Sequence, residues 1–211
     1  MTGTLILVAG AVAVAILLHA EARGMSRLRA VAKLSAAALF IAYALHNGAM
    51  SSSFGLAILF ALSLSAIGDA FLLSRHPTAF LGGMAAFALA HASYACAFLT
   101  TDFTFSPLTL LTAAVVCVLA FVYLPPILRN AGDFLFPLLN YAGIIAIMTI
   151  ASGMVGPDAP AAAWRYAAAA SIFAISDIAV ARDQFLAQSI RNKLWGLPLY
   201  FGAQFLFAAS V

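Results

Sequence analysis

The sequence predicts an all-α, polytopic membrane protein: a bundle of about eight transmembrane helices with both termini on the non-cytoplasmic side. Three observations predict this fold class. Hydrophobic residues make up 65% of the 211 residues and charged residues only 8%, against roughly 45–50% and about 25% in soluble domains. Long apolar stretches alternate with short polar breaks, and the basic residues concentrate in every second break.

This composition excludes several classes of protein. Seventeen charged side chains cannot cover the surface of a water-soluble enzyme of this size. The chain is also too apolar to be disordered. The 10 basic and 7 acidic residues form no run or patch, which excludes nucleic acid as a partner. The lipid bilayer is therefore the expected surrounding of the whole chain.

Each span follows from helix geometry, because crossing about 30 Å of hydrocarbon takes ~20 apolar residues in an α-helix. Strands are not expected, since the stretches are unbroken and rich in Ala and Leu, whereas barrel strands alternate over ~10 residues. We predict a single membrane domain, residues 1–211, with spans at Thr4–Ala20, Leu28–His46, Phe54–Leu73, Thr78–Leu99, Leu108–Leu124, Phe134–Ser152, Ala161–Val180 and Leu194–Ala209.

Short motifs and single residues add predictions for the first, fourth and fifth of these spans. The first runs into Ala20-Glu21-Ala22, which fits a signal-peptide cleavage site, but no basic segment precedes it, so we predict a retained helix. The fifth ends before Pro125-Pro126, because proline breaks a helix. Cys96 and Cys117 fall inside the fourth and fifth spans, where we expect apolar packing and neither a disulfide nor a metal site.

The orientation follows from the positive-inside rule, by which Lys and Arg stay on the cytoplasmic side. Arg165 lies on the opposite side, and Lys33 lies inside a span. We therefore expect both termini outside the cytoplasm. We also expect the membrane to be a bacterial inner (cell) membrane. The other eight basic residues lie in the first, third, fifth and seventh connections: Arg23, Arg27, Arg29, Arg75, Arg129, Arg182, Arg191 and Lys193.

Three ionisable residues lie inside the predicted spans: Lys33, Asp69 and Asp177. On insertion scales each costs about 2.5–3.5 kcal/mol at the bilayer centre, so such residues usually face a bundle interior and have a function. Counted from the nearest cytoplasmic arginines at 1.5 Å per residue, all three lie roughly 6–9 Å inside the cytoplasmic ends. Their common depth predicts one functional cluster.

Other polar residues join this cluster. Tyr200 and Gln204 are an i,i+4 pair, and His91 and Tyr94 an i,i+3 pair, so each pair lies on one helix face. The alternative is that these groups only hydrogen-bond neighbouring helices, and that Lys33 extends to the interface or neutralises one Asp. The predicted supporting residues are His91, Tyr94, Asn140, Tyr141, Tyr200 and Gln204.

The two Asp segments resemble each other, Ala66-Ile67-Gly68-Asp69 against Ala174-Ile175-Ser176-Asp177. The third and seventh spans run in the same direction. The similarity therefore predicts a possible parallel repeat of two four-helix halves, about 1–100 and 106–211, which would bring the two Asp together about a pseudo-twofold axis. Chance similarity between Ala-rich helices is the alternative.

The polar residues and their neighbours form an ordered series of short motifs. The series is Gly68-Asp69 with Leu72, then Leu81-Gly82, Phe87, His91, Tyr94 and Ala97-Phe98, then Tyr141, Phe173 with Ser176-Asp177, and Tyr200 with Ala203-Gln204. In this order and spacing, the chain resembles the YhhN-like integral membrane lysoplasmalogenase family over nearly its full length. It departs from the family at Lys33-Leu34, where Lys is typically followed by Pro.

The resemblance implies hydrolysis of the vinyl ether bond of a lysoplasmalogen, a lysophospholipid, to a fatty aldehyde and a glycerophospho-base. Protonation of the alkenyl carbon beta to oxygen gives an oxocarbenium ion that water attacks, and one carboxylic acid with one carboxylate suits these steps. We therefore expect Asp69 and Asp177 to share the catalytic roles in the cytoplasmic half, without a metal or other cofactor. The residues expected either to meet the phosphate or only to set topology are Arg75, Arg182, Arg191 and Lys193.

Two other functions fit the same cluster. A proton-coupled transporter could use paired intramembrane Asp and Lys at a repeat interface. A non-catalytic assembly protein could use the cluster only for helix packing, and Asp-to-Asn changes would then lower stability and not turnover. An uptake assay beside an enzyme assay separates transporter from hydrolase. The sequence carries no signal for an oligomeric state.

Overall fold

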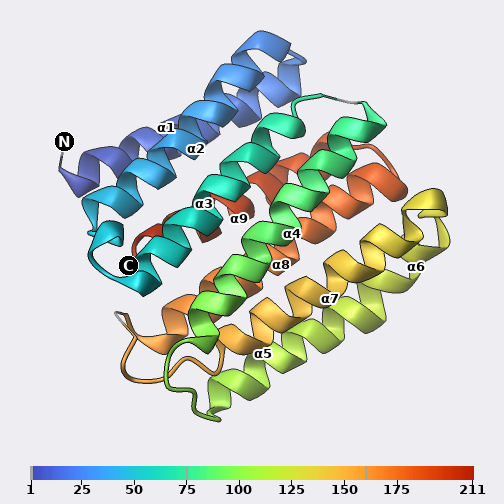
Figure 1. Ribbon diagram of the computed structural model, residues 1–211. Coiled ribbons are helices and arrows are strands. Elements are labelled where there is room, and N and C mark those ends of the chain that lie inside the picture. Colours follow the sequence, from blue (N-terminus) through green and yellow to red (C-terminus); the bar gives the residue numbers. More distant parts are fainter. Residues whose placement is uncertain (1, 75, 160) are drawn as a thin grey trace.

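The computed structural model describes residues 2–74, 76–159 and 161–211. In that part of the chain, eight helical segments run back and forth in one bundle, as Figure 1 shows. This confirms the predicted all-α class. The elements are α1 (Gly3–Arg23), α2 (Ser26–His46), η1 (Ala49–Ser51), α3 (Ser53–Phe71), α4 (Pro77–Leu99), α5 (Pro107–Val118), η2 (Leu119–Tyr123), α6 (Leu124–Arg129), η3 (Gly132–Phe134), α7 (Leu135–Ser152), α8 (Ala163–Phe185) and α9 (Ile190–Ala208).

Several helices begin at a side chain that caps the first turn. The first N–H groups of a helix have no partner within it, and a hydroxyl oxygen before the helix accepts from one of them. Ser52 does so for α3, Ser106 for α5 and Ser189 for α9. Ser106 also forms a reciprocal capping box with Thr109. These caps place the helix starts at short polar breaks.

The fifth segment does not end where the sequence predicted. It continues from α5 through η2, one stretch of π-helix, into α6 and reaches Arg129. Pro125 and Pro126 have no N–H to bond the carbonyls four residues earlier, so the backbone widens at 119–123 instead of stopping. The predicted end at Leu124 was therefore wrong, because two adjacent prolines fit the first turn of α6.

Two cysteines were predicted to pack inside the bundle. Instead, Cys96 on α4 and Cys117 on α5 are both exposed. Cys117 lies on the segment 107–129, little of which is buried inside the bundle. The prediction was wrong because an apolar stretch alone does not tell the buried face of a membrane helix from the lipid-facing one.

α1 begins and α9 ends at one end of the bundle, and α1, α3, α6 and α8 all end at the other (Figure 1). At this second end, Arg29 donates to the Leu73 carbonyl at 2.7 Å and Lys193 donates to Glu21 at 2.8 Å. We call it the basic end. It carries the described basic residues of the predicted cytoplasmic connections: Arg23, Arg27, Arg29, Arg129, Arg182, Arg191 and Lys193.

Among the described residues, six helices are long and apolar enough to cross a membrane: α1, α2, α3, α4, the segment 107–129 and the segment 132–152. The other two long helices, α8 and α9, also run the length of the bundle, and α8 carries four charged residues, among them Arg165 and Asp177. They pack tightly on each other, and α9 also packs against α1, α2 and α3. A helix shielded by its neighbours can carry polar residues that a lipid-facing helix cannot.

The core follows α9 and the helices around it. Phe40, Phe98, Phe173, Phe201 and Phe207 are fully or almost fully buried and belong to one continuous cluster. Alanines at the crossings let the backbones approach closely, as is usual between membrane helices. This aromatic core surrounds the polar residues of the site.

Candidate active site

The first group of polar side chains joins α2, α3 and α9. Lys33 Nζ lies 3.2 Å from Asp69 Oδ1, and the Tyr200 hydroxyl donates to Asp69 Oδ2 at 2.6 Å. Asp69 is 1% exposed and Lys33 7% exposed. A buried carboxylate with a cation and a hydrogen-bond donor is compensated for the loss of water. The predicted neighbourhood of Lys33 and one Asp is thus present.

The second group joins α4, α7 and α8. His91 Nε2 lies 3.2 Å from Asp177 Oδ2, and the Tyr141 hydroxyl donates to the same oxygen at 3.1 Å. On its other side, His91 Nδ1 contacts the carbonyl oxygen of Phe87, one helical turn earlier. The His91 side chain is fully buried, and that of Asp177 is 12% exposed. Both contacts of the carboxylate therefore come from inside the bundle.

An aromatic ring lies against both groups. The Phe173 ring centroid is 4.3 Å from that of His91 and 5.4 Å from that of Tyr200. Phe87 packs edge-on against Tyr200 at 5.7 Å and against Phe173 at 6.3 Å. The ring of Phe87 also covers Gly68, where an added Cβ would lie 2.6 Å from it. The two carboxylates thus belong to separate polar groups that share an apolar aromatic wall.

Of the remaining predicted supporting residues, two are buried and one is exposed. The Tyr94 hydroxyl donates to Gln204 Oε1 at 2.7 Å, and both side chains are fully buried between α4 and α9. Asn140 was predicted in the cluster, but it is exposed and donates to the Phe136 carbonyl of its own helix at 2.8 Å. That prediction was wrong because Asn140 precedes Tyr141, and adjacent residues point to different faces of a helix.

The Tyr94–Gln204 pair leads to a prediction about stability. Tyr94→Phe should lower the free energy of unfolding by about 1–3 kcal/mol, because Gln204 Oε1 then stays buried without a donor. The double variant Tyr94→Phe/Gln204→Leu should recover most of that loss, since no polar group is left unpaired. Thermal unfolding of the purified variants measures both. A double variant less stable than Tyr94→Phe would contradict it.

A cavity of about 100 Å³ reaches the second group only. Asp177 and Tyr141 both line it, and its other walls come from the π-helix η2, α6, α7 and α8. This volume has room for a few water molecules. Asp69 and Tyr200 do not line it. Asp177 is therefore the carboxylate that a substrate or water in this cavity could meet.

Sequence reasoning missed the part that Phe87 has in this site. Its backbone carbonyl is what fixes the His91 ring, and its side chain packs against Tyr200. The spacing was visible, because a helical side chain can bond the carbonyl four residues earlier. Leu119 and Ile178, which line the cavity, gave no sequence signal beyond being apolar.

The basic residues expected near a phosphate lie in different surroundings. Lys193 is paired with Glu21 at 2.8 Å, so it serves the contact between α1 and α9. Arg75 lies outside the described residues. Arg182 and Arg191 line a second, larger hollow between α5, η2, α8 and α9, and no carboxylate of the described residues pairs with either.

Known proteins resemble this chain in sequence. Lysoplasmalogenase TMEM86A of Bos taurus is 33% identical over 157 residues, and the human protein of the same name is 31% identical over 157 residues; each match covers 71% of this chain and 62% of the relative. Lysoplasmalogenase TMEM86B of Homo sapiens is 34% identical over 151 residues, covering 71% of this chain and 61% of the relative. The match thus spans about three fifths of each relative's length.

No solved structure gives a significant match to the chain. The sequence profile of the YhhN family matches residues 28–211, which include every polar residue of both groups described above. Because this match covers most of the chain, the protein belongs to the YhhN family.

Proposed function

We propose that this protein is a membrane-embedded hydrolase that cleaves the vinyl ether bond of lysoplasmalogens, giving a fatty aldehyde and a glycerophospho-base. The observation that carries the proposal is the His91–Asp177–Tyr141 group beside a cavity in the bundle. The bovine and human relatives are named lysoplasmalogenases, which supports this class of reaction. The substrate is then a lysophospholipid that reaches the site from the bilayer.

The proposal assigns the catalytic proton to the His91–Asp177 pair. The Phe87 carbonyl can only accept, so His91 Nδ1 carries a hydrogen. His91 Nε2 lies 3.2 Å from Asp177 Oδ2 without a hydrogen bond to any described residue. In this proposal the two side chains together hold one transferable proton, carried by the imidazole or by the carboxyl group. Either form can donate this proton to a substrate.

The reaction follows from that proton. The His91–Asp177 pair protonates the alkenyl carbon beta to the ether oxygen, and the former double bond becomes an oxocarbenium ion. Water in the cavity attacks the positive carbon and returns its proton to the pair, which restores the acid. The resulting hemiacetal loses the glycerol oxygen as an alcohol and leaves the aldehyde. One water is consumed, and the Tyr141 hydroxyl holds the carboxylate in place.

Asp69 is the second carboxylate of the proposal. It pairs with Lys33 and accepts a hydrogen bond from Tyr200, and it does not line the cavity. Its role is electrostatic: a fixed negative charge behind the aromatic wall favours the cationic intermediate, and in a water-poor site such charges act over distance. In this proposal Asp177 is the acid, and Asp69 stabilises the cation without touching it.

The experiment that tests the function is aldehyde release from lysoplasmenylethanolamine by purified protein in nanodiscs, followed by mass spectrometry. In D₂O the aldehyde should carry one deuterium on the carbon next to the carbonyl, because the catalytic proton is delivered there. Matched lysolipids with a saturated ether or an ester at the same position should release nothing. No aldehyde from the vinyl ether lipid, or equal cleavage of the ester, would refute the proposal.

The transporter alternative is not favoured, since the relatives are named lysoplasmalogenases. We propose that the site lies in the cytoplasmic half of the membrane, because the basic end is the predicted cytoplasmic one. Cysteine labelling tests this placement: a cysteine at exposed Arg129 should react with an impermeant reagent only after the cells are opened.

A further inference from the structure

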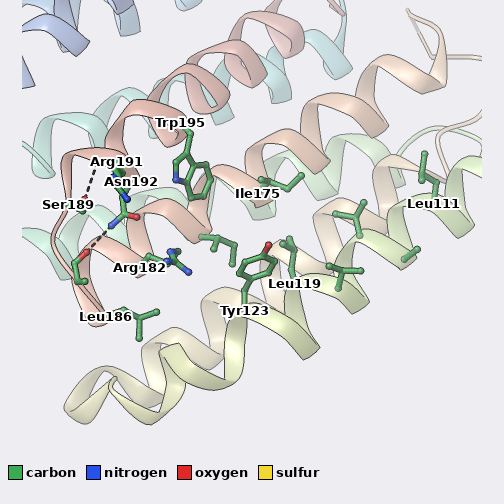
Figure 2. Close-up of a pocket in the computed structure, with 15 residues that line it drawn as sticks. Leu111, Leu119, Tyr123, Ile175, Arg182, Leu186, Ser189, Arg191, Asn192 and Trp195 are labelled. Atoms are coloured by element: carbon green, nitrogen blue, oxygen red, sulfur yellow. Dashed lines mark hydrogen bonds between the residues drawn. The ribbon is translucent and has the colours of Figure 1, made fainter. Parts of the chain in front are cut away.

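A long hollow lies on the outside of the bundle, beside the proposed site. It has a volume of about 940 Å³ and lies between the segment α5–η2 on one side and α8 with the start of α9 on the other. Figure 2 shows Leu111 at one end of it, and Arg182 with Leu186 toward the other. Its size falls near the upper end of pockets that hold one small ligand, roughly 300–1,000 Å³.

The hollow exists because α5 stands away from its neighbours. Leu110, Val118 and Phe121 of this segment are 74%, 53% and 80% exposed. The segment packs mainly on α7 and touches α8 only lightly. Between Leu111 and Leu119 the wall is apolar and about 12 Å long at 1.5 Å per residue. Such a wall, open to the bilayer, suits one hydrocarbon chain.

The other end of the hollow is polar and positive. Arg182 extends into it, and Arg191, Ser189 and Asn192 line the same end (Figure 2). Asp183 is the nearest acidic residue in sequence, and its carboxylate accepts from the Ser189 N–H at 2.8 Å and from Asn192 at 3.3 Å. It therefore braces the turn before α9 and leaves both guanidinium groups available. Two arginines suit the oxygens of a phosphate.

We propose that this hollow, which we call the lateral groove, is the binding site for a single-chain phospholipid, with the phosphate at Arg182 and Arg191 and the chain along α5. The choice of lipid rests on the proposed function. Leu119 and Ile178 line both the lateral groove and the cavity at Asp177, so the two spaces adjoin. Arg182 lies five residues beyond Asp177 on α8, about 7.5 Å along the axis, which suits the glycerol between phosphate and vinyl ether.

Tryptophan fluorescence can test binding without any turnover. The chain has two tryptophans, and Trp195 lines the lateral groove. In Trp164→Phe, all tryptophan emission comes from Trp195. The probe is a lysophosphatidylethanolamine with a brominated chain and a saturated ether, which has no vinyl ether to cleave. It should quench Trp195 in a saturable way, whereas the same ether glycerol without phosphate should bind about tenfold more weakly.

Matched variants locate the two ends of the groove. Arg182→Gln/Arg191→Gln should weaken binding about tenfold or more, whereas Arg129→Gln, at the same end of the bundle but outside the groove, should not. Ala114→Phe fills the apolar part and should also weaken binding, whereas Leu110→Phe, outside it, should not. All five positions are exposed, so the variants should fold. Their elution in size exclusion checks this.

Several outcomes would overturn the proposal. Quenching that rises without saturation, or that is equal in the Arg and control variants, means that the groove is not a lipid site. Displacement of the lipid by micromolar inorganic phosphate would make it a free-anion site instead. Aldehyde release without saturable quenching would refute the lateral groove and leave the function standing. Saturable binding without any aldehyde release would refute the proposed function and leave the lateral groove standing as a lipid site.

Discussion

Asp177→Asn should reduce aldehyde release by about 10²–10⁴-fold, the usual contribution of a positioned acid, while the protein keeps its fold. Asparagine has the same shape and still accepts from Tyr141, but it removes the carboxyl group that in our proposal holds the catalytic proton together with His91. The catalytic rate constant in nanodiscs, beside the thermal unfolding midpoint, measures both effects. A variant with full activity would remove Asp177 from the mechanism.

Two further variants make this test specific. Asp133→Asn makes the same chemical change at an exposed position just before α7 and should leave the activity unchanged. His91→Gln should lose a similar factor, and the double variant His91→Gln/Asp177→Asn should be little worse than either single one, because the two side chains act as one acid. Multiplying losses would show that they act independently.

Lys33→Met should lower the free energy of unfolding by about 3–5 kcal/mol, because it leaves the buried Asp69 carboxylate without its cation. Asp69→Asn should cost a comparable amount by leaving the ammonium group unpaired. The double variant Lys33→Met/Asp69→Asn should recover most of the stability, since both charges are gone. Unfolding of the three variants in the same detergent measures the effect. Glu21→Gln, which breaks the more exposed pair with Lys193, should cost less than about 1 kcal/mol.

Activity of the stable double variant separates two roles of Asp69. In our proposal its negative charge stabilises the oxocarbenium ion, so the double variant should fold well and turn over slowly. Full activity would make Lys33 and Asp69 a structural ion pair and would leave Asp177 as the only carboxylate in the reaction. Lost stability in the double variant would instead mean that the charges are not the reason for the destabilisation.

The helices and most residues of the polar interior were predictable from the sequence, but the predicted single cluster is divided into two polar groups. An apolar stretch of fixed length dictates a membrane helix, and charged residues inside such stretches are rare enough to mark a shared interior. Lys33, Asp69, His91, Tyr141 and Asp177 do lie in that interior. The prediction for Asn140 was wrong because its neighbour Tyr141 faces inward. The predicted helix end at the proline pair was wrong because the backbone widens into a π-helix.

The possible repeat stays a prediction, but the contacts follow the pattern that it requires. Asp69, in the third span, is bonded from the second and eighth spans, through Lys33 and Tyr200. Asp177, in the seventh span, is bonded from the sixth and fourth, through Tyr141 and His91. If every span number is shifted by four, counting on from the eighth span to the first, the spans that contact Asp69 become the spans that contact Asp177. The partners differ in chemistry, a lysine against a histidine, which is how two similar carboxylates can take different roles.

By itself, the sequence determined that this protein is a bundle of membrane helices with two carboxylates and a lysine inside it, because hydrocarbon tolerates only helices and few charges. Only the tertiary structure decided which groups meet. Lys33 lies beside Asp69 and not Asp177, His91 lies beside Asp177, and Asp177, but not Asp69, lines the cavity of about 100 Å³. These pairings depend on how helices far apart in the chain rotate and pack, and no local spacing encodes that rotation.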